Sequence, residues 1–169
     1  IKNIKVKNAV FFVVDDSAYS FPQLNYQIHG IIGFPVIEAL KEIQITKDDK
    51  LIIPKNETVW NNESNAALSN NKLYISINDT AYGFDTGASS TWLNKRYYDA
   101  NKKTIEAYYQ KGAFLQGNIG GIDTVREYLI TFCTTINGKK VVVPNVNILT
   151  KDTSLEEDVY GRIGQDFIH

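Results

Sequence analysis

Residues 73–90 read LYISINDTAYGFDTGASS and contain the clearest structural signal in the chain. Residues 73–77 and 81–84 have the composition of β-strands, and Asn78-Asp79 between them favours a tight turn, so the pattern predicts a β-hairpin. The returning strand ends at Asp85-Thr86-Gly87, where a turn of this composition can point backbone N–H groups at the carboxylate. We therefore expect the hairpin to present an acidic side chain at a strand end.

Short β segments also dominate the rest of the chain. Residues 4–14 (IKVKNAVFFVV) are predicted to form a strand because they are rich in Val, Ile and Phe. Hairpins are expected at residues 43–53, around a four-residue turn, and at residues 114–135, around a glycine-rich tip. Asn137-Gly138 predicts a further hairpin with a two-residue turn. These segments indicate an all-β protein.

Little helix is expected. Residues 34–42 combine an early proline with apolar side chains at helical spacing, which predicts a short helix. Residues 92–111, with several tyrosines among lysines, are expected to form a loop with one helical turn.

Composition excludes several classes of protein. The chain has 169 residues, 43% of them hydrophobic, which allows one ordinary domain or two small ones with a substantial core. Its 18 basic and 19 acidic side chains give a net charge of −1, which is not the charge pattern of a nucleic-acid-binding protein. Cys133, the one cysteine, forms no internal disulfide and is expected to be buried in a strand. No spacing of Cys and His predicts a metal site, and no apolar run predicts a transmembrane segment.

The sequence contains an internal repeat. Residues 6–10 resemble residues 143–147, and residues 29–34 resemble residues 160–165 in the same order. We interpret the repeat as two related lobes: residues 1–54 are the C-terminal part of a first lobe, residues 55–71 an asparagine-rich linker, and residues 72–169 a second lobe. Both lobes are expected to be incomplete, the first at its N-terminal side and the second at its C-terminal end.

The segment Phe84-Asp85-Thr86-Gly87-Ala88 resembles the active-site loop of the aspartic peptidases. Three more features follow in the order found in retropepsins: the glycine-rich residues 117–122 at the position of the flap, the turn at residues 136–140, and the glycine-containing residues 160–167. The resemblance covers residues 73–169 and implies a closed acid-protease β-barrel with a flap hairpin and a short helix. It also implies that residues 29–42 belong to a preceding, related lobe of a two-lobed, bacterial-type protein.

The resemblance implies an aspartic endopeptidase in which Asp85, Thr86 and Gly87 form one half of the catalytic centre. Asn118, Ile119, Gly120 and Gly121 would belong to the flap that covers the substrate. The implied partners are an extended peptide or protein substrate and a second lobe, with no metal and no cofactor. Two alternatives stay open: a homodimer that contains two copies of Asp85, and a non-catalytic peptide-binding module of the same fold. An extracytoplasmic location is expected from the two-lobed relatives.

Overall fold

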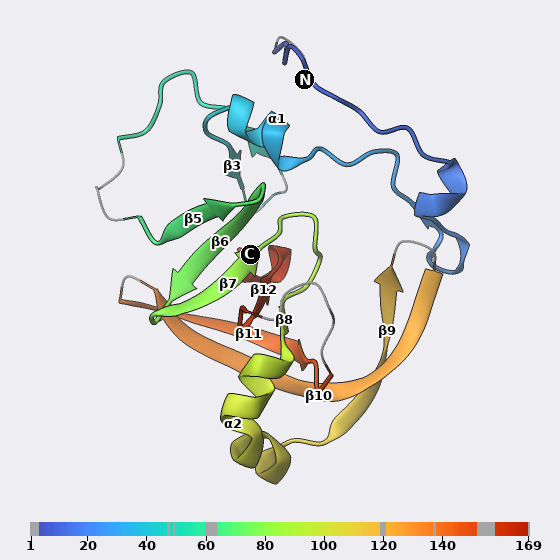
Figure 1. Cartoon of the computed structure of the whole chain (residues 1–169), viewed down its shortest axis with the longest axis vertical. Helices are drawn as coiled ribbons and strands as arrows, with labels where there is room; N and C mark the ends of the chain where they lie inside the picture. The colour runs from blue at the N-terminus through green and yellow to red at the C-terminus, as the bar shows by residue number, and fades with distance from the viewer. Residues whose placement is uncertain are drawn as a thin grey trace. The chain divides into compact units, whose positions relative to one another are not determined.

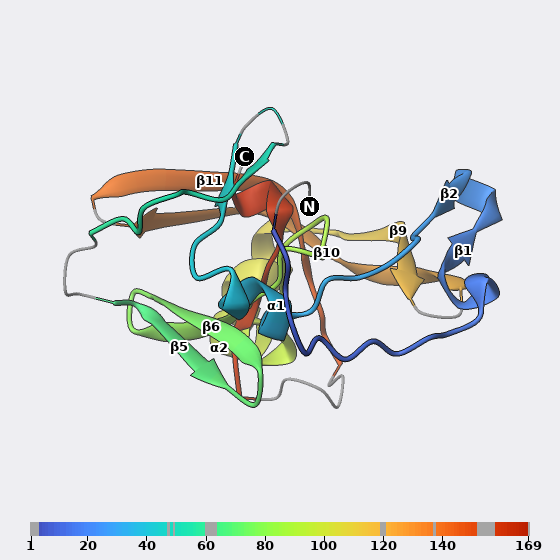
Figure 2. The same ribbon diagram turned by 90° about the horizontal axis from the view of Figure 1, so that it is seen from above.

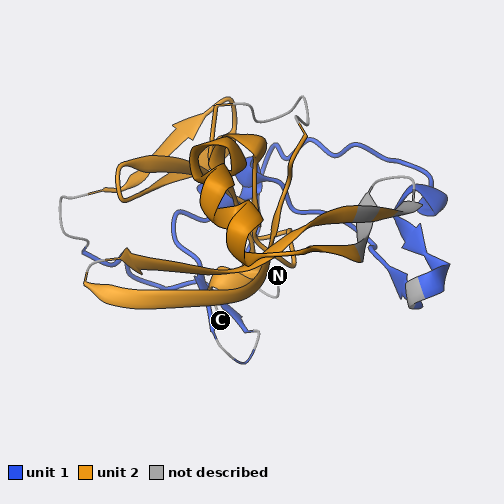
Figure 3. Ribbon diagram, turned by 90° about the horizontal axis from the view of Figure 1, so that it is seen from below, with its two compact units in different colours: residues 1–63, 117–122 blue, residues 64–116, 123–169 orange. Residues whose placement is uncertain are grey.

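The computed structural model describes residues 4–46, 48, 50–59, 64–118, 121–136, 138–151 and 158–168. The chain divides into two compact units, shown in different colours in Figure 3: residues 1–63 with 117–122, and residues 64–116 with 123–169. Most of the regular structure is β, as the sequence predicts, and its main element is one large mixed sheet. Among the described residues, no helix is long and apolar enough to cross a membrane.

The first unit contains short elements. In chain order they are η1 (Asp16–Tyr19), β1 (Ser20–Phe21), η2 (Pro22–Leu24), β2 (Tyr26–Gln27), α1 (Phe34–Ala39), β3 (Gln44–Ile45) and β4 (Leu51–Ile52). The predicted helix is confirmed, with Pro35 in its first turn, where the missing N–H costs nothing. The predicted hairpin is confirmed by the antiparallel pairing of β3 with β4.

The strand expected at residues 4–14 is wrong. These residues pair with no other described strand, and Val10, Phe11, Phe12 and Val13 are 76% to 95% exposed. A strand needs a hydrogen-bonded neighbour, which the composition of the segment cannot supply.

The second unit is built on an eight-stranded sheet in the order β5-β6-β7-β12-β8-β11-β10-β9. Figure 1 labels these strands, and Figure 2 shows the same structure from above. Its strands are β5 (Ala66–Ser69), β6 (Lys72–Ile77), β7 (Thr80–Phe84), β8 (Trp92–Leu93), β9 (Lys111–Asn118), β10 (Gly121–Ile136), β11 (Lys139–Ile148) and β12 (Gly161–Ile163). The hairpins β6–β7 and β10–β11 are antiparallel, as predicted, and Gly138 in the second turn has a φ of +75°. β9 also lies beside β10, as expected. Residues 66–69, which the sequence placed in the linker, form β5.

The short strand β12 determines the topology around the carboxyl end of β7. It is inserted between β7 and β8, parallel to the first and antiparallel to the second, although β7 and β8 are close in sequence. A short 3₁₀-helix, η3 (Gln165–Phe167), follows β12. This insertion brings residues 161–166 beside the loop that follows β7.

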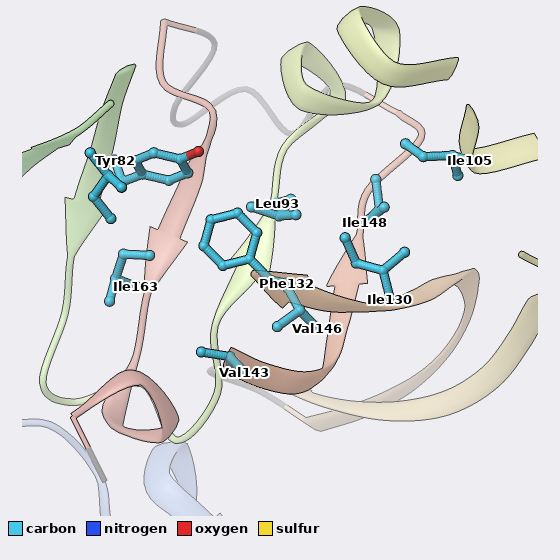
Figure 4. Packing of buried hydrophobic residues seen from close by; sticks show 10 residues of the cluster. Tyr82, Leu93, Ile105, Ile130, Phe132, Val143, Val146, Ile148 and Ile163 are labelled. Carbon is cyan, nitrogen blue, oxygen red and sulfur yellow. The ribbon is translucent and has the colours of Figure 1, made fainter. Parts of the chain in front are cut away.

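The core of the second unit lies between the sheet and α2 (Lys95–Tyr108). In Figure 4, Leu93, Phe132 and Val146 point toward one another from three strands. α2 contributes Ile105, which is 2% exposed, and Tyr97 and Tyr98 pack against the same cluster. The loop with one helical turn expected at residues 92–111 is therefore wrong: this segment contains a helix of 14 residues.

Cys133 is exposed, which corrects the expectation that its thiol is buried. Its neighbours Phe132 and Thr134 are buried. Successive side chains of a strand point to opposite faces, so the two neighbours face the core and Cys133 faces away from it.

Candidate functional site

Asp85 lies at the carboxyl end of β7. Its backbone N–H donates to the carbonyl of Ile163 over 3.0 Å, which continues the parallel pairing of β7 with β12 by one residue. The position of Asp85 is therefore fixed by two strands, its own and β12. The Asp85 side chain is 39% exposed, so an approaching molecule can reach it.

The turn after Asp85 points donors at this residue, as the sequence predicts. The N–H of Gly87 donates to Oδ1 of Asp85 over 2.9 Å, and the N–H of Ala88 donates to its backbone carbonyl over 3.2 Å. A Cβ on residue 87 would lie 3.2 Å from the same Oδ1. Glycine at this position therefore lets the amide approach the carboxylate without crowding it.

The loop of residues 85–91, here called the Asp85 loop, is held by a polar network around the buried Thr91. The carboxylate of Asp166 accepts the backbone N–H of Thr91 over 2.8 and 2.9 Å and its hydroxyl over 2.6 Å. The hydroxyl oxygen of Thr91 also accepts the N–H of Gly164 over 3.0 Å. Thr91 is 0% exposed, so these bonds replace the water that its polar atoms have lost.

Two glycines permit the close approach of residues 160–167, here called the glycine segment. A Cβ on Gly164 would lie 2.6 Å from the carbonyl carbon and oxygen of Ser90. A Cβ on Gly161 would lie 2.4 Å from the carbonyl oxygen of Trp92. Both contacts are with backbone, which cannot move aside as a flexible side chain can, so only glycine fits.

Gln165 joins the glycine segment to the start of the Asp85 loop. Its backbone N–H donates to the carbonyl of Ala88 over 2.9 Å, and its Nε2 donates to the carbonyl of Thr86 over 2.7 Å. Within the described part of the chain, the hydroxyl of Thr86 makes no hydrogen bond. The backbone of Thr86 is therefore fixed, while its hydroxyl retains its capacity to bond.

Arg162 forms an ion pair with Asp85. Its Nη1 lies 3.1 Å from Oδ2 of Asp85, and its Cζ lies 4.9 Å from the centre of the Trp92 ring. The Arg162 side chain is 24% exposed, so the pair is partly shielded from water. The carboxylate of Asp85 thus accepts the Gly87 amide on one oxygen and the Arg162 guanidinium on the other.

Tyrosines pack together in the core of the second unit. Burial raises the pKa of Tyr82 to about 12, and Coulombic interaction with Tyr97 and Tyr160 adds to the effect. Burial also raises the pKa of Tyr97. The rings of Tyr82 and Tyr97 both lie near Phe132, with centroids 6.0 and 6.3 Å away, which makes their role one of packing.

The structure brings together Asp85, Thr86 and Gly87. Of the four predicted flap residues, Asn118 ends β9 and Gly121 begins β10. The other two, Ile119 and Gly120, lie outside the described residues.

Sequence reasoning gave no role to Thr91, Arg162 or Asp166. Arg162 and Asp166 lie in the glycine segment, which carries part of the resemblance and could have drawn attention to them. Their contacts with the Asp85 loop depend on the insertion of β12 between β7 and β8, which the sequence does not show.

The arrangement offers a fixed, accessible carboxylate beside a guanidinium. Among the described residues, no three His, Cys, Asp or Glu side chains come together as metal ligands. Neither a scan against protein-family models nor a search of curated proteins finds a match to this chain. The geometry can support proton transfer by the carboxylate, or binding of a polar group by the carboxylate and guanidinium.

Proposed function

We propose that this chain supplies one half of an aspartic endopeptidase, with Asp85 as one of its two catalytic carboxylates. The observation that carries the proposal is the geometry of Asp85: a carboxylate at a strand end, held through Oδ1 by the Gly87 amide and 39% exposed. The polar network of Thr91, Gly164 and Asp166 supports it, because a catalytic group must be held in position by its surroundings. The proposal includes the retropepsin-like fold, a closed barrel with a flap.

Hydrolysis would use a water molecule held between Asp85 and a second aspartate. Two carboxylates at such a short distance share one proton, because the repulsion between two negative charges prevents both from being ionised. The ionised carboxylate takes a proton from the water as the oxygen of the water forms a bond to the peptide carbon. The protonated carboxylate gives its proton to the carbonyl oxygen. The first carboxylate then passes the proton it took from the water to the nitrogen as the C–N bond breaks, and one hydroxyl of the intermediate returns a proton to the second carboxylate. The products are a carboxylic acid and an amine.

The second aspartate would come from another lobe of the same protein or from a second copy of the chain. The hydroxyl of Thr86 would bond across to the opposing loop and fix the distance between the carboxylates. Its backbone is fixed by Gln165 and its hydroxyl has no partner among the described residues, which supports this role. The hairpin of β9 and β10, with Asn118 and Gly121 at its ends, would cover an extended peptide.

The ion pair with Arg162 favours a second candidate, a peptide-binding module without catalysis. Arg162 occupies Oδ2 of Asp85, an oxygen that the water would otherwise use. A site that keeps this pair in its complexes would bind peptides and leave them intact.

The test is cleavage of a mixed peptide library by the full-length protein that carries this chain, from about pH 3 to pH 8. Asp85→Asn removes the proposed base and keeps the shape of the side chain. Asp79→Asn is the matched control, since Asp79 is an exposed carboxylate in the turn of the same hairpin. The 169-residue chain is assayed beside it over a range of concentrations, because activity from a homodimer rises more steeply than the concentration of chain.

We expect cleavage by the wild-type protein and by Asp79→Asn, and none by Asp85→Asn. Equal cleavage by all three proteins would exclude Asp85 from the catalytic centre. Peptide binding without cleavage by any of them would select the second candidate.

A further inference from the structure

The register of three strands places Arg162 at the centre of the candidate site. On β12, Arg162 pairs with Gly83 of β7 on one side and with Trp92 of β8 on the other. Its guanidinium lies against the Trp92 ring and reaches Oδ2 of Asp85. The indole therefore supports the cation from one side, while the carboxylate of Asp85 accepts from its nitrogen.

The pair of Arg162 and Asp85 is exchangeable. Both side chains are partly exposed, at 24% and 39%, so a dissolved carboxylate can approach the guanidinium. A guanidinium binds carboxylates through a planar fork of donors, and any carboxylate of suitable geometry fits that fork. The contact with Trp92 is made by the guanidinium carbon and can persist when the carboxylate partner changes.

Peptide hydrolysis would favour this exchange. In the free chain the Gly87 amide bonds to Oδ1 of Asp85 and Arg162 bonds to Oδ2. A water molecule activated by Asp85 competes with Arg162 for Oδ2. A peptide carboxylate can offer the guanidinium a charge-assisted hydrogen bond in place of the one to Oδ2.

We propose that Arg162 is a specificity-determining residue that binds a carboxylate side chain of the peptide and releases Oδ2 of Asp85 as it does so. The preferred peptides then carry Glu or Asp close to the bond held at Asp85. This inference rests on the proposed function for the peptide and for its place beside Asp85.

The test compares matched peptides by isothermal titration calorimetry. Extended hexapeptides carry a single Glu, moved through each position in turn, and each has a partner with Gln at the same position. The proteins are the wild-type full-length protein, Arg162→Gln, which removes the charge, Arg162→Lys, which keeps the charge without the planar fork, and Asp85→Asn. In Asp85→Asn the competing carboxylate is gone and cleavage is not expected to disturb the titration.

At one position at least, Asp85→Asn is expected to bind the Glu peptide about tenfold or more tightly than its Gln partner. It should also bind the Glu peptide severalfold more tightly than the wild type does, while binding of the Gln peptide stays the same. Arg162→Gln is expected to lose the preference for Glu, and Arg162→Lys to retain part of it. If Arg162 had a merely structural role, Arg162→Gln would bind both peptides of a pair more weakly, and by the same factor.

The inference is overturned by equal binding of the two peptides at every position, or by a preference that survives in Arg162→Gln. If Arg162→Gln does not fold, the comparison of Asp85→Asn with the wild type decides the matter alone. A preference for Glu without any cleavage supports the inference and removes catalysis from the proposed function. Cleavage without a preference for Glu overturns the inference and supports the proposed function.

Discussion

Replacing Thr91 by valine tests whether the polar network around this buried residue holds the Asp85 loop. The two side chains have the same shape, so Thr91→Val removes the hydroxyl with little change in packing. The hydrogen bond to Asp166, at 2.6 Å, is lost, and the N–H of Gly164 loses its acceptor. Asp166 keeps the backbone N–H of Thr91.

The expected loss of stability follows from these two bonds. A hydrogen bond to a charged group contributes about 1.5 to 3 kcal/mol, and a buried N–H left without a partner costs about 1 to 3 kcal/mol. Together they predict a decrease of about 2.5 to 6 kcal/mol in the free energy of unfolding of the second unit. With a urea dependence of about 2 kcal/mol per molar, the unfolding midpoint falls by about 1.2 to 3 M.

The assay is equilibrium urea unfolding followed by circular dichroism. Thr80→Val is the matched control, because among the described residues the Thr80 hydroxyl donates only to the exposed carbonyl of Asn78, over 3.3 Å, and a change below about 0.5 kcal/mol is expected. A midpoint for Thr91→Val as close to the wild type as that of Thr80→Val would refute the reasoning.

Three further predictions concern other parts of the chain. Gly164→Ala should destabilise the second unit by about 2 kcal/mol or more in the same urea assay, because its Cβ would lie 2.6 Å from the Ser90 backbone. Gly30→Ala is the control and should be neutral, because a Cβ on residue 30 would have no neighbouring atom within 4 Å. Equal effects of the two substitutions would contradict the close approach of Gly164 to Ser90. The pKa of Tyr82 is raised from 10.0 to about 12, so its contribution to stability is complete below pH 10 and is lost as the pH rises through about 12. Tyr82→Phe should remove up to about 3 kcal/mol of this alkaline loss, and an unchanged profile of unfolding midpoint against pH would exclude the explanation. Hydrogen bonds from the hydroxyl and then the backbone N–H of Thr58 lower the pKa of Glu42 from 4.5, so the stability that Glu42 contributes is present above pH 4.5 and is lost as the pH falls through the lowered value. An NMR titration of Thr58→Val should show a higher pKa for Glu42 than in the wild type. An unchanged pKa would assign the effect to another group.

Local turn chemistry made part of this structure predictable. Asn137-Gly138 and Asn78-Asp79 each determine a hairpin through the few residues of the turn, and both hairpins form. The turn at Asp85 is likewise local, since Gly87 bonds to a carboxylate two residues before it. Patterns of this kind depend on sequence neighbours and can be identified in the sequence.

Long-range pairing was the part that sequence could not determine. The composition of residues 4–14 favours a strand, yet no partner within the described residues pairs with it. α2 was missed because its tyrosines and lysines suggested a loop, although residues 95–108 contain neither Gly nor Pro and Ile105 reaches the core. The contact of Arg162 with Asp85 depends on the register of β12, which connects residues that are 77 positions apart.

The most direct test of the central proposal is the specificity constant kcat/KM of the full-length protein for its best library peptide, measured beside Asp85→Asn and Asp79→Asn. Removal of a general base costs about a hundredfold to ten-thousandfold in rate. We predict a fall of that size in Asp85→Asn and an unchanged constant in Asp79→Asn. A constant for Asp85→Asn within about twofold of the wild type would contradict the assignment of Asp85 as a catalytic carboxylate.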